Sequence, residues 1–376
     1  MKKLRKWTII FLLALPVMTL VGMRVGWWFV PKKPLKVLAM DKTGLTPEGQ
    51  EKQPLFWVLN NDRYVRKNGL LYDGRRDYLG FFPLENKQYR VKDFQHMTET
   101  EIQHVVSNID VTYYIGTAGV SADIAKHSGF VQRGMTEKDM SFLKKMKTDG
   151  KLIFAEFNTI ASPTKANVRR DFENEFGIHW SGWLGQYFTS LDSTSTELPQ
   201  GIINNYKKQH AGTWPFSHSG IVFIHEKGIV EVLDGKRDLI NPVPMIHTFS
   251  YGINSLGMKK RMPYSYWFDI VQITDSTNHA ISAYELKVNN SGQKLLNKNG
   301  IPAVFPAVIM HNDKDYKFYY FCGNYCDNKV PLNSSYFVGG QYLSLMLDGT
   351  SSNLFFYKLF QPMVSSILEQ YSDIHH

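Results

Sequence analysis

The chain has 376 residues, a formal net charge of +9, 14% aromatic residues and two cysteines. Seven of its positive charges lie within residues 1–33, ahead of the first acidic residue, Asp41, and nine minus seven leaves only +2 for the chain from residue 34 onward. Because the excess charge is confined to one end, the composition argues against nucleic acid as a partner. The seven early charges belong to Lys2, Lys3, Arg5, Lys6, Arg24, Lys32 and Lys33.

The first thirty residues have the pattern of a membrane anchor. Residues 1–6 read MKKLRK, and residues 7–23 contain no charged side chain. With its extension to Val30, this apolar run is close to the ~20 residues needed to cross ~30 Å of hydrocarbon. The positive-inside rule then predicts a cytoplasmic stub at 1–6, a single transmembrane anchor at 7–30 and an extracytoplasmic remainder at the cell membrane. A cleaved signal peptide is the alternative, because Gly22 and Gly26 keep cleavage possible.

Predicted strands and helices alternate between residues 35 and 212. The clearest helix is 136–147, with Thr136 as its N-cap, and an apolar strand at 151–157 follows it. This alternation is typical of parallel βαβ units, so the range 35–212 is predicted to be an α/β domain with a parallel, flavodoxin-like sheet. The other elements expected here are strands at 35–40, 88–91 and 111–115, an aromatic turn at 77–83, and helices at 55–59, 167–176 and 199–209.

Strands dominate after residue 213. The range 213–376 is predicted to be a strand-rich second half, either separate from the first or continuous with it. A helix at 353–371, kinked at Pro362, is expected to close the chain. The expected strands are 220–225, 228–233, 266–273, 280–288, 303–311 and 316–321.

Polar side chains follow several of the predicted parallel strands. In open parallel sheets, ligands bind beyond the carboxyl ends of the strands. Applied to this chain, that rule gathers the residues that follow 35–40, 111–115 and 151–157, together with an arginine on the next helix. The expected ligand-binding residues are Lys42, Thr43, Thr117, Asn158 and Arg169, and the candidate catalytic residues are Asp41 and Glu156.

Glu156 is the strongest catalytic candidate, because a carboxylate inside an apolar strand is costly to bury unless it is paired. Burial would raise its pKa toward use as a general acid. Asp41 or Asp110 would then supply the second carboxylate of a carbohydrate-active hydrolase. The alternative is a structural ion pair of Glu156 with Lys42 or with an arginine of the following helix, Arg169 or Arg170.

Two further features leave alternatives open. Trp180 and Trp183 lie in the glycine-broken stretch 178–188 and form either a sugar-binding wall or a loop packed on the sheet. Cys322 and Cys326 are candidates for a disulfide in an exported protein, or free thiols. The named phosphate, dinucleotide and zinc motifs do not occur, so no metal and no cofactor are expected.

The layout of the first half resembles the flavodoxin-like sheet of class I glutamine-amidotransferase-like domains. In that family a nucleophilic cysteine follows the third strand, where this chain has Gly116-Thr117-Ala118-Gly119. The resemblance therefore implies a relative that does not hydrolyse glutamine. Five motifs together are also similar to uncharacterised, membrane-anchored bacterial proteins that accompany envelope or exopolysaccharide machinery. They are DKTG at 41–44, FWVLNN at 56–61, DYLGF at 77–81, GKLIFAEFN at 150–158 with SPT at 162–164, and YYFCGN at 319–324.

These patterns predict a membrane-anchored, extracytoplasmic protein of cell-envelope or exopolysaccharide handling. It would bind glycan or support a synthesis or export complex. Its expected partners are the membrane through 7–30, a glycan and an envelope protein complex. Two alternatives stay open: a carbohydrate-active hydrolase that uses Glu156, and a structural interaction protein without a ligand site.

Overall fold

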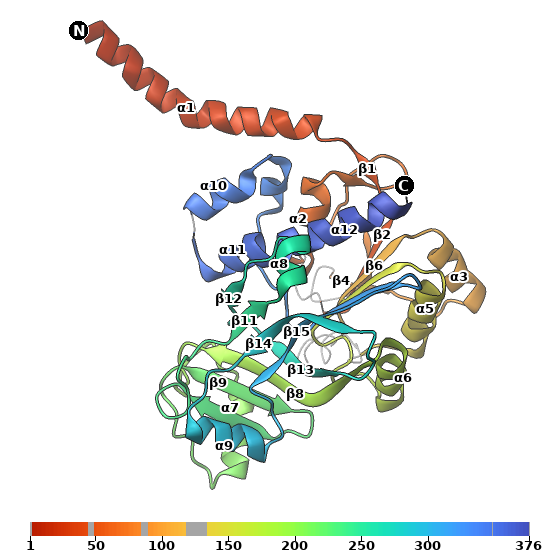
Figure 1. Ribbon diagram of the computed structural model, residues 1–376, viewed down its shortest axis with the longest axis vertical. Helices are drawn as coiled ribbons and strands as arrows, with labels where there is room; N and C mark the ends of the chain where they lie inside the picture. The colour runs from red at the N-terminus through yellow and green to blue at the C-terminus, as the bar shows by residue number, and fades with distance from the viewer. Residues whose placement is uncertain (1, 44–48, 84–88, 118–133, 348, 376) are drawn as a thin grey trace.

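The computed structural model describes residues 2–43, 49–83, 89–117, 134–347 and 349–375, and its body is built around one large sheet (Figure 1). Within these residues, ten strands form the sheet in the order β12-β11-β14-β15-β16-β7-β6-β2-β4-β5. The α/β prediction is confirmed, although the sheet is mixed rather than purely parallel. The strands are β2 (Val37–Asp41), β4 (Tyr78–Pro83), β5 (Tyr89–Lys92), β6 (Val111–Gly116), β7 (Leu152–Glu156), β11 (Met245–Thr248), β12 (Arg261–Pro263), β14 (His279–Glu285), β15 (Val304–Asn312) and β16 (Lys317–Phe321).

The centre of the sheet is a run of parallel strands, β4, β2, β6, β7 and β16. Numbered by their order along the chain, these strands are arranged 2-1-3-4-5. The chain moves from β2 to one side of the sheet and from β6 onward to the other side. Its direction therefore reverses between β2 and β6, and such a switch point opens a crevice at the carboxyl ends of the two strands.

Antiparallel strands extend both edges of this parallel centre. β5 pairs with β4 at one edge, and β15, β14, β11 and β12 continue the sheet beyond β16 at the other. β16 comes from the range 213–376 but lies between β7 and β15. The ranges 35–212 and 213–376 therefore contribute strands to the same sheet.

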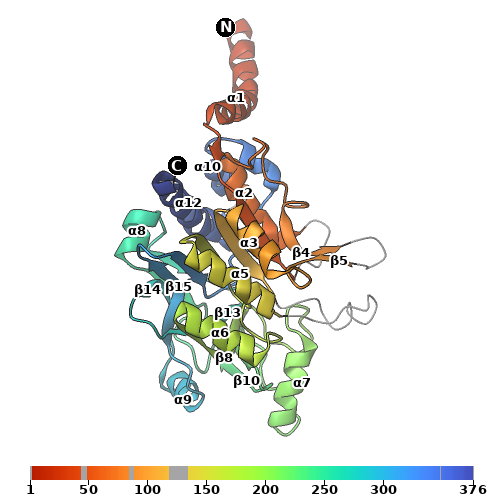
Figure 2. The same ribbon diagram turned by 90° about the vertical axis from the view of Figure 1, so that its right-hand side faces the viewer.

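Helices cover both faces of the large sheet (Figure 2). The predicted helix at 136–147 is confirmed as α5, where Thr136 and Asp139 form a capping box that satisfies N–H groups of the first turn. On one face lie α3 (Glu99–Ser107), α5 (Glu137–Thr148) and α6 (Ala166–Phe176). On the other face lie α2 (Gln53–Asn61), α8 (Ser250–Leu256) and α12 (Gln361–His375).

The stretch 178–188 is a strand, so the prediction of a loop there was wrong. It forms β8 (Ile178–Phe188), an inner strand of a second, antiparallel sheet with the order β10-β9-β8-β13. Its side chains alternate between buried and more exposed at Ile178, His179 and Trp180, the period-two pattern of a strand. The other elements of this part are α7 (Gln200–Gln209), β9 (Gly220–His225), β10 (Val230–Asp234), β13 (Phe268–Ile273) and α9 (Asn290–Lys298).

Residues 78–83 also form a strand, β4, where the sequence predicted an aromatic turn. Gly80 has a φ of 129°, and a Cβ atom added there would lie 1.7 Å from the carbonyl oxygen of Asp41. β4 can therefore approach β2 this closely only because position 80 carries no side chain.

The C-terminal helix predicted at 353–371 is confirmed, with an interruption. It consists of α11 (Ser351–Phe355), a π-helical turn η4 (Phe356–Phe360) and α12. Pro362 is the second residue of α12, so the irregular turn lies just before the proline, whose missing N–H and ring disturb a regular helix.

The N-terminal helix α1 (Lys2–Phe29) projects from the body, and α10 (Gly340–Leu347) lies beside its second half (Figures 1 and 2). Among the residues that the structure describes, no helix is both long and apolar enough to cross a membrane. The anchor at 7–30 stays a prediction. Short elements complete the fold: β1 (Lys33–Pro34), η1 (Gln50–Lys52), β3 (Tyr64–Val65) and η3 (Leu332–Tyr336).

Candidate functional site

A pocket of about 220 Å³ lies at the carboxyl ends of the parallel strands. This end of the sheet includes the switch point between β2 and β6, and open α/β sheets bind ligands at such a point. The volume is below the ~300–1,000 Å³ typical of small-molecule pockets, so the pocket suits one ring-sized unit of a larger ligand. The lining residues that offer a polar group or an indole ring are Thr43, Glu51, Asn158, Trp267, Asn324 and Asp327.

Three parallel strands bring four of these residues together. Thr43 follows β2 and Asn158 follows β7, whereas Asn324 and Asp327 lie in the loop after β16. Because β2, β7 and β16 run in the same direction, their carboxyl ends meet at one edge of the sheet. The pocket thus contains Thr43 and Asn158, which the sequence placed at this edge.

Two other lining residues reach the pocket from outside the parallel strands. Glu51 is the middle residue of η1. Trp267 directly precedes β13, and its carbonyl oxygen accepts a hydrogen bond of 2.9 Å from the backbone N–H of Asn324. This bond holds the indole beside the loop that follows β16.

The backbone at Asn158 is held in an unusual conformation. Its φ of 64° lies in the left-handed region, which asparagine tolerates better than most residues. The Thr117 hydroxyl group lies 3.2 Å from the carbonyl oxygen of Asn158 and 2.7 Å from that of Thr159, so it donates to this turn. Thr117, an expected ligand-binding residue, is fully buried and instead fixes the shape of the turn that presents Asn158.

The pocket holds two carboxyl groups whose pKa values are raised. Burial raises the pKa of Glu51, and the charges of Asp41 and Asp327 raise it further. Burial also raises the pKa of Asp327, although Gln50 donates a hydrogen bond of 3.3 Å to its carboxylate. Among the described residues, Glu51 Oε2 is buried without a hydrogen-bond partner. Both carboxyl groups would therefore gain from a proton or from a positively charged ligand.

Asp41 was expected to be catalytic, but the structure places it in a buried ion pair. Its Oδ2 lies 2.7 Å from Lys52 Nζ, and both side chains are almost fully buried. Its Oδ1 accepts hydrogen bonds from the backbone N–H and the hydroxyl group of Thr43, at 2.9 and 2.8 Å. Asp41 therefore shapes the end of β2 and positions Thr43.

Lys42 was expected to bind ligand or to pair with Glu156, and in the structure its partner is Asp139 instead of Glu156. Its Nζ lies 2.6 Å from Asp139 Oδ2, and both side chains are buried. The two lysines next to the pocket, Lys42 and Lys52, are thus each neutralised by their own carboxylate. Within the described part of the chain no lysine or arginine lines the pocket, and the charge of Lys52, which lowers the pKa of Glu51, is outweighed by burial.

Glu156 is completely buried in the core and lies outside the pocket lining. The Tyr113 hydroxyl donates a hydrogen bond of 2.9 Å to its Oε2, and the backbone N–H of Cys326 lies 3.3 Å from its Oε1. Burial raises the pKa of Glu156 well above its usual value. The alternative of an ion pair with Lys42, Arg169 or Arg170 is not what the structure shows, because these residues pair elsewhere or lie away from Glu156 among the described residues.

Asp110 and Arg169 lie away from the pocket. Asp110 precedes β6 and accepts a hydrogen bond from the backbone N–H of Lys36. It therefore lies at the amino ends of the parallel strands, whereas Glu156 lies at their carboxyl ends. The proposed carboxylate pairs of Glu156 with Asp41 or Asp110 therefore do not face each other across an open site. Arg169 forms an ion pair of 2.7 Å with Glu226 and lies over the ring of Trp180.

Trp180 and Trp183 do not form a sugar-binding wall. Their exposed fractions are 3% and 5%, and the indole N–H of Trp180 donates to the carbonyl oxygen of Trp183. Both rings belong to the large hydrophobic core. The packed alternative is the one that the structure shows.

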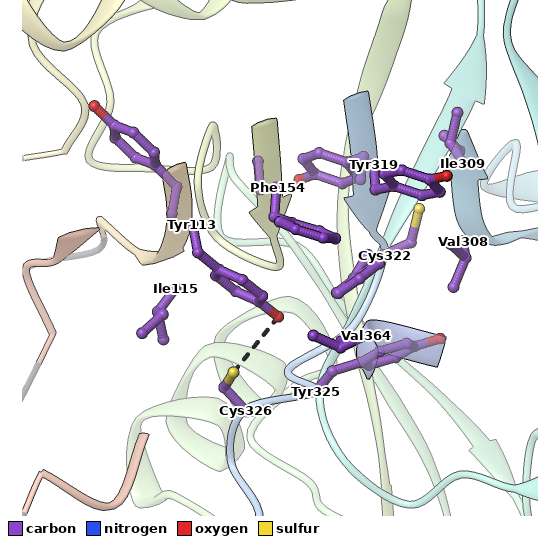
Figure 3. Close-up of a cluster of buried hydrophobic side chains, with 14 of the residues drawn as sticks. Tyr113, Ile115, Phe154, Val308, Ile309, Tyr319, Cys322, Tyr325, Cys326 and Val364 are labelled. Carbon is purple, nitrogen blue, oxygen red and sulfur yellow. Dashed lines mark hydrogen bonds between the residues drawn. The ribbon is translucent and has the colours of Figure 1, made fainter. Parts of the chain in front are cut away.

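Cys322 and Cys326 are both free and buried, so the disulfide expected between them is absent. Figure 3 shows their sulfur atoms pointing to different parts of the core, with Cys326 Sγ directed to the hydroxyl group of Tyr113 at 3.5 Å. Burial raises the pKa of both thiols well above the usual value. In the part of the chain that is described, no cluster of histidine, cysteine and acidic residues could hold a metal ion.

The sequence analysis missed Glu51, Trp267, Asn324 and Asp327. It predicted the strand at 316–321 but assigned it to the strand-rich second half and not to the parallel strands. Had that strand been taken as the fifth parallel strand, the loop that contains Asn324 and Asp327 would have been placed at the ligand edge. No comparable signal marks Glu51 or Trp267, because both come from elements outside the parallel strands.

Comparisons with known proteins give structural likeness only. No protein-family model and no curated protein matches this chain. Similar solved structures include a putative ThuA-like protein from Bacteroides uniformis, with 10% identity and a TM-score of 0.37 over 89% of this chain and 93% of that one. A cold-adapted β-galactosidase from Rahnella sp. R3 has 8% identity and a TM-score of 0.35 over 84% of this chain and 32% of that one. A carbohydrate deacetylase has 9% identity and a TM-score of 0.31 over 87% and 33%. This chain spans about a third of the length of the latter two, and likeness at this level carries neither a family nor a function to it.

Proposed function

We propose that this protein is a membrane-anchored, extracytoplasmic protein of cell-envelope polysaccharide handling that binds a sugar unit in the pocket at the β2/β6 switch point. The observation that carries the proposal is the composition of that pocket. Trp267 offers a flat ring, Asn158 and Asn324 offer amide donors and acceptors, and two carboxyl groups complete the polar lining. An aromatic ring with convergent polar groups suits the faces and hydroxyl groups of a sugar.

The charge of the pocket restricts which sugar would bind. Glu51 and Asp327 face no cationic side chain within the described lining, because Lys52 and Lys42 are paired with Asp41 and Asp139. An anionic sugar would have to enter beside two acidic groups, at a cost in free energy. We therefore expect neutral or positively charged sugars, such as hexosamine units with a free amino group, to bind in preference to uronic acids.

The order of the parallel strands supports the resemblance to class I glutamine-amidotransferase-like domains. The parallel order 2-1-3-4-5 is that of flavodoxin-like sheets, whose ligands bind at the switch point between the first and third strands. We propose that the sheet is amidotransferase-like with its nucleophile lost, since β6 ends at Gly116 and is followed by Thr117, with no cysteine at this turn. Support of a synthesis or export complex remains compatible with such a binding role.

Titration of the purified full-length chain with uncharged and charged oligosaccharides tests the proposal. The probes are tetramers of N-acetylglucosamine, of glucosamine and of galacturonic acid, and isothermal calorimetry measures their affinities. We expect the first two to bind and galacturonate to bind at least ~10-fold more weakly, a difference of about 1.4 kcal/mol. Absence of binding by all three would overturn the proposal.

Two matched tryptophan variants locate the binding site. Trp267→Ala removes the ring at the pocket and should weaken binding of the N-acetylglucosamine tetramer at least ~10-fold. Trp214→Ala is the control, because Trp214 and Trp267 are both half-buried and pack against the same small cluster beside α7, but Trp214 does not line the pocket. Equal losses in the two variants would show that the sugar binds elsewhere or that the loss reflects stability.

A hydrolase remains a second candidate, and one observation favours it. Glu51 and Asp327 share the pocket, and burial raises the pKa of each. A carboxyl group with a raised pKa can donate a proton to a leaving group while its partner stays ionised. Release of reducing ends from the same tetramers would reveal turnover, and Glu51→Gln should abolish it. Glu156→Gln should leave any turnover unchanged, because Glu156 is not at the pocket.

A further inference from the structure

The exposed apolar side chains of this protein are concentrated on two helices. Of the 19 large apolar side chains exposed in the described residues, nine lie on α1 and four lie between Val338 and Leu347. The remaining six are distributed over other elements, as is normal for a protein surface. The second group includes α10, in which Tyr342, Met346 and Leu347 are 64%, 84% and 78% exposed.

The sequence of α10 suits an apolar environment along its outer side. It reads GQYLSLML and contains no charged residue. Leu345, on the other side, packs against the large core, so the helix is held to the body while Met346 and Leu347 point outward. At 1.5 Å per residue α10 is about 12 Å long, too short to cross ~30 Å of hydrocarbon. A helix of this kind can only lie along an apolar surface.

The segment before α10 is fixed to the last turns of α1. The backbone N–H of Val338 donates a hydrogen bond of 3.1 Å to the carbonyl oxygen of Met23. The Arg24 guanidinium group donates to the carbonyl oxygen of Tyr336 at 3.1 Å, and the ring of Trp27 meets that of Tyr336 edge to face. α10 therefore lies beside the end of α1, as both views of the molecule show (Figures 1 and 2).

The end of α1 itself has the composition of a membrane interface. Trp28 and Phe29 are 59% and 80% exposed, and Lys32 and Lys33 follow them. Tryptophan residues gather where hydrocarbon meets the headgroups, and lysine side chains reach from there toward water. α10 continues this exposed apolar surface from α1 onto the body.

We propose that α10 lies in the interfacial layer of the lipid bilayer that the N-terminal segment enters, so that the body contacts the membrane at a second place. The proposal rests on the membrane anchor of the proposed function. Continuity with the apolar run of α1 and the absence of charge on α10 favour lipid over a protein partner. With α1 and α10 both engaged, the body cannot turn freely about its anchor, and α9 lies at the end of the body opposite to α1 (Figure 1).

Site-directed fluorescence on the full-length chain in liposomes tests the proposal. Met346→Cys and Ile240→Cys each introduce one accessible thiol for a polarity-sensitive label, because Cys322 and Cys326 are buried. Ile240 is the matched control: it is 70% exposed and bonded to Lys287, which precedes α9 at the far end of the molecule. The liposomes are phosphatidylcholine and phosphatidylglycerol, with or without lipid brominated on its acyl chains.

The expected result is a blue-shifted label at position 346 that brominated lipid quenches at least twofold more than the label at position 240. Equal quenching at the two positions would overturn the proposal. A label at position 346 that is shielded from aqueous iodide but not quenched by brominated lipid would also overturn it, in favour of a protein partner. Failure of the unlabelled chain to enter liposomes would overturn the inference together with the anchor, whereas the pocket experiments above would be unaffected.

Discussion

The hydroxyl group of Tyr113 donates a hydrogen bond of 2.9 Å to the carboxyl group of Glu156, from strand β6 to the adjacent strand β7. Both side chains are fully buried, and burial raises the pKa of Glu156 well above its usual value. A protonated carboxyl group needs no cation, which agrees with the lack of a lysine or arginine paired with Glu156 among the residues that the structure describes. The residue that the sequence marked most strongly as catalytic is therefore a polar link inside the core.

This relationship predicts unequal effects of two conservative substitutions. Tyr113→Phe leaves a buried oxygen of Glu156 without its donor, and we expect a loss of about 1–2 kcal/mol in the free energy of unfolding. Glu156→Gln keeps a neutral group of the same shape and should cost less. Urea unfolding of both variants measures the difference, and a Glu156→Gln protein that is folded but unable to bind sugar would contradict the structural role.

The buried Lys52–Asp41 pair predicts a large effect from removal of one partner. Lys52→Met leaves the carboxylate of Asp41 buried without its counter-charge, and we expect a loss of about 3–5 kcal/mol in the free energy of unfolding. The double variant Lys52→Met with Asp41→Asn should recover part of this loss, since no buried charge remains. A double variant no more stable than the single one, in the same urea titration, would count against this account.

The raised pKa of Asp62 should make the free energy of unfolding of the protein depend on pH. Burial raises its pKa to about 6, although a hydrogen bond with Ser365 and the charge of Lys33 act in the opposite direction. The folded state binds the proton more tightly than the unfolded state, so the stabilisation is complete below pH ~4 and is lost as the pH rises through about 6. We expect wild type to lose about 3 kcal/mol relative to Asp62→Asn between pH 4 and 7.5, at about 1.36 kcal/mol per pKa unit. Urea unfolding at four pH values measures this, with the exposed Asp313→Asn as a control that should show no such trend.

The pocket predicts that affinity for a cationic sugar rises with pH. Burial raises the pKa of Glu51 and of Asp327, so both carboxyl groups ionise at higher pH than usual. As the pH rises through the ionisation of these two carboxyl groups, the glucosamine tetramer should bind more tightly while its amino groups stay protonated, whereas the N-acetylated tetramer should change little. Calorimetry at three pH values tests this, and Asp327→Asn should flatten the glucosamine trend. A trend that persists in Glu51→Gln and Asp327→Asn together would place the charge elsewhere.

The free thiols predict slow alkylation of the folded protein. Burial of Cys322 and Cys326 raises the pKa of each thiol, so little reactive thiolate forms near neutral pH. Iodoacetamide should modify neither residue in native buffer and both in 6 M urea without a reductant, as mass spectrometry would show. A requirement for reductant before alkylation would indicate the disulfide that the structure lacks.

Several helices and strands could be predicted from local sequence patterns, because the residues that define them lie close together in the chain. Thr136 and Asp139 form a capping box at the start of α5, and the strand at 151–157 is a continuous apolar run. The same kind of signal was overlooked before α3, where Thr98 and Glu101 form a capping box. These elements are fixed by neighbouring residues, so one sequence suffices to predict them.

Other features depend on partners far along the chain and could not be predicted in the same way. The stretch 178–188 contains glycines and reads as a loop, but pairing with β9 and β13 makes it a strand. Lys42 and Asp139 meet across 97 positions, so nothing near Lys42 reveals its partner. The general rule on parallel sheets was enough to predict that a pocket lies at the carboxyl ends of the strands. Its acidic residue Asp327 could not be predicted, because it depends on where β16 inserts into the sheet.

The position of β16 has a consequence for how this protein is made. Leu152 of β7 pairs with Lys317 of β16, so one edge of β7 has no partner until nearly the whole chain has emerged. Contacts this distant slow folding and leave strand edges exposed in the meantime. Asn324 and Asp327 arrive with β16, and the pocket is therefore among the last features to form. Sugar binding would then report that synthesis and folding of the chain have gone to completion.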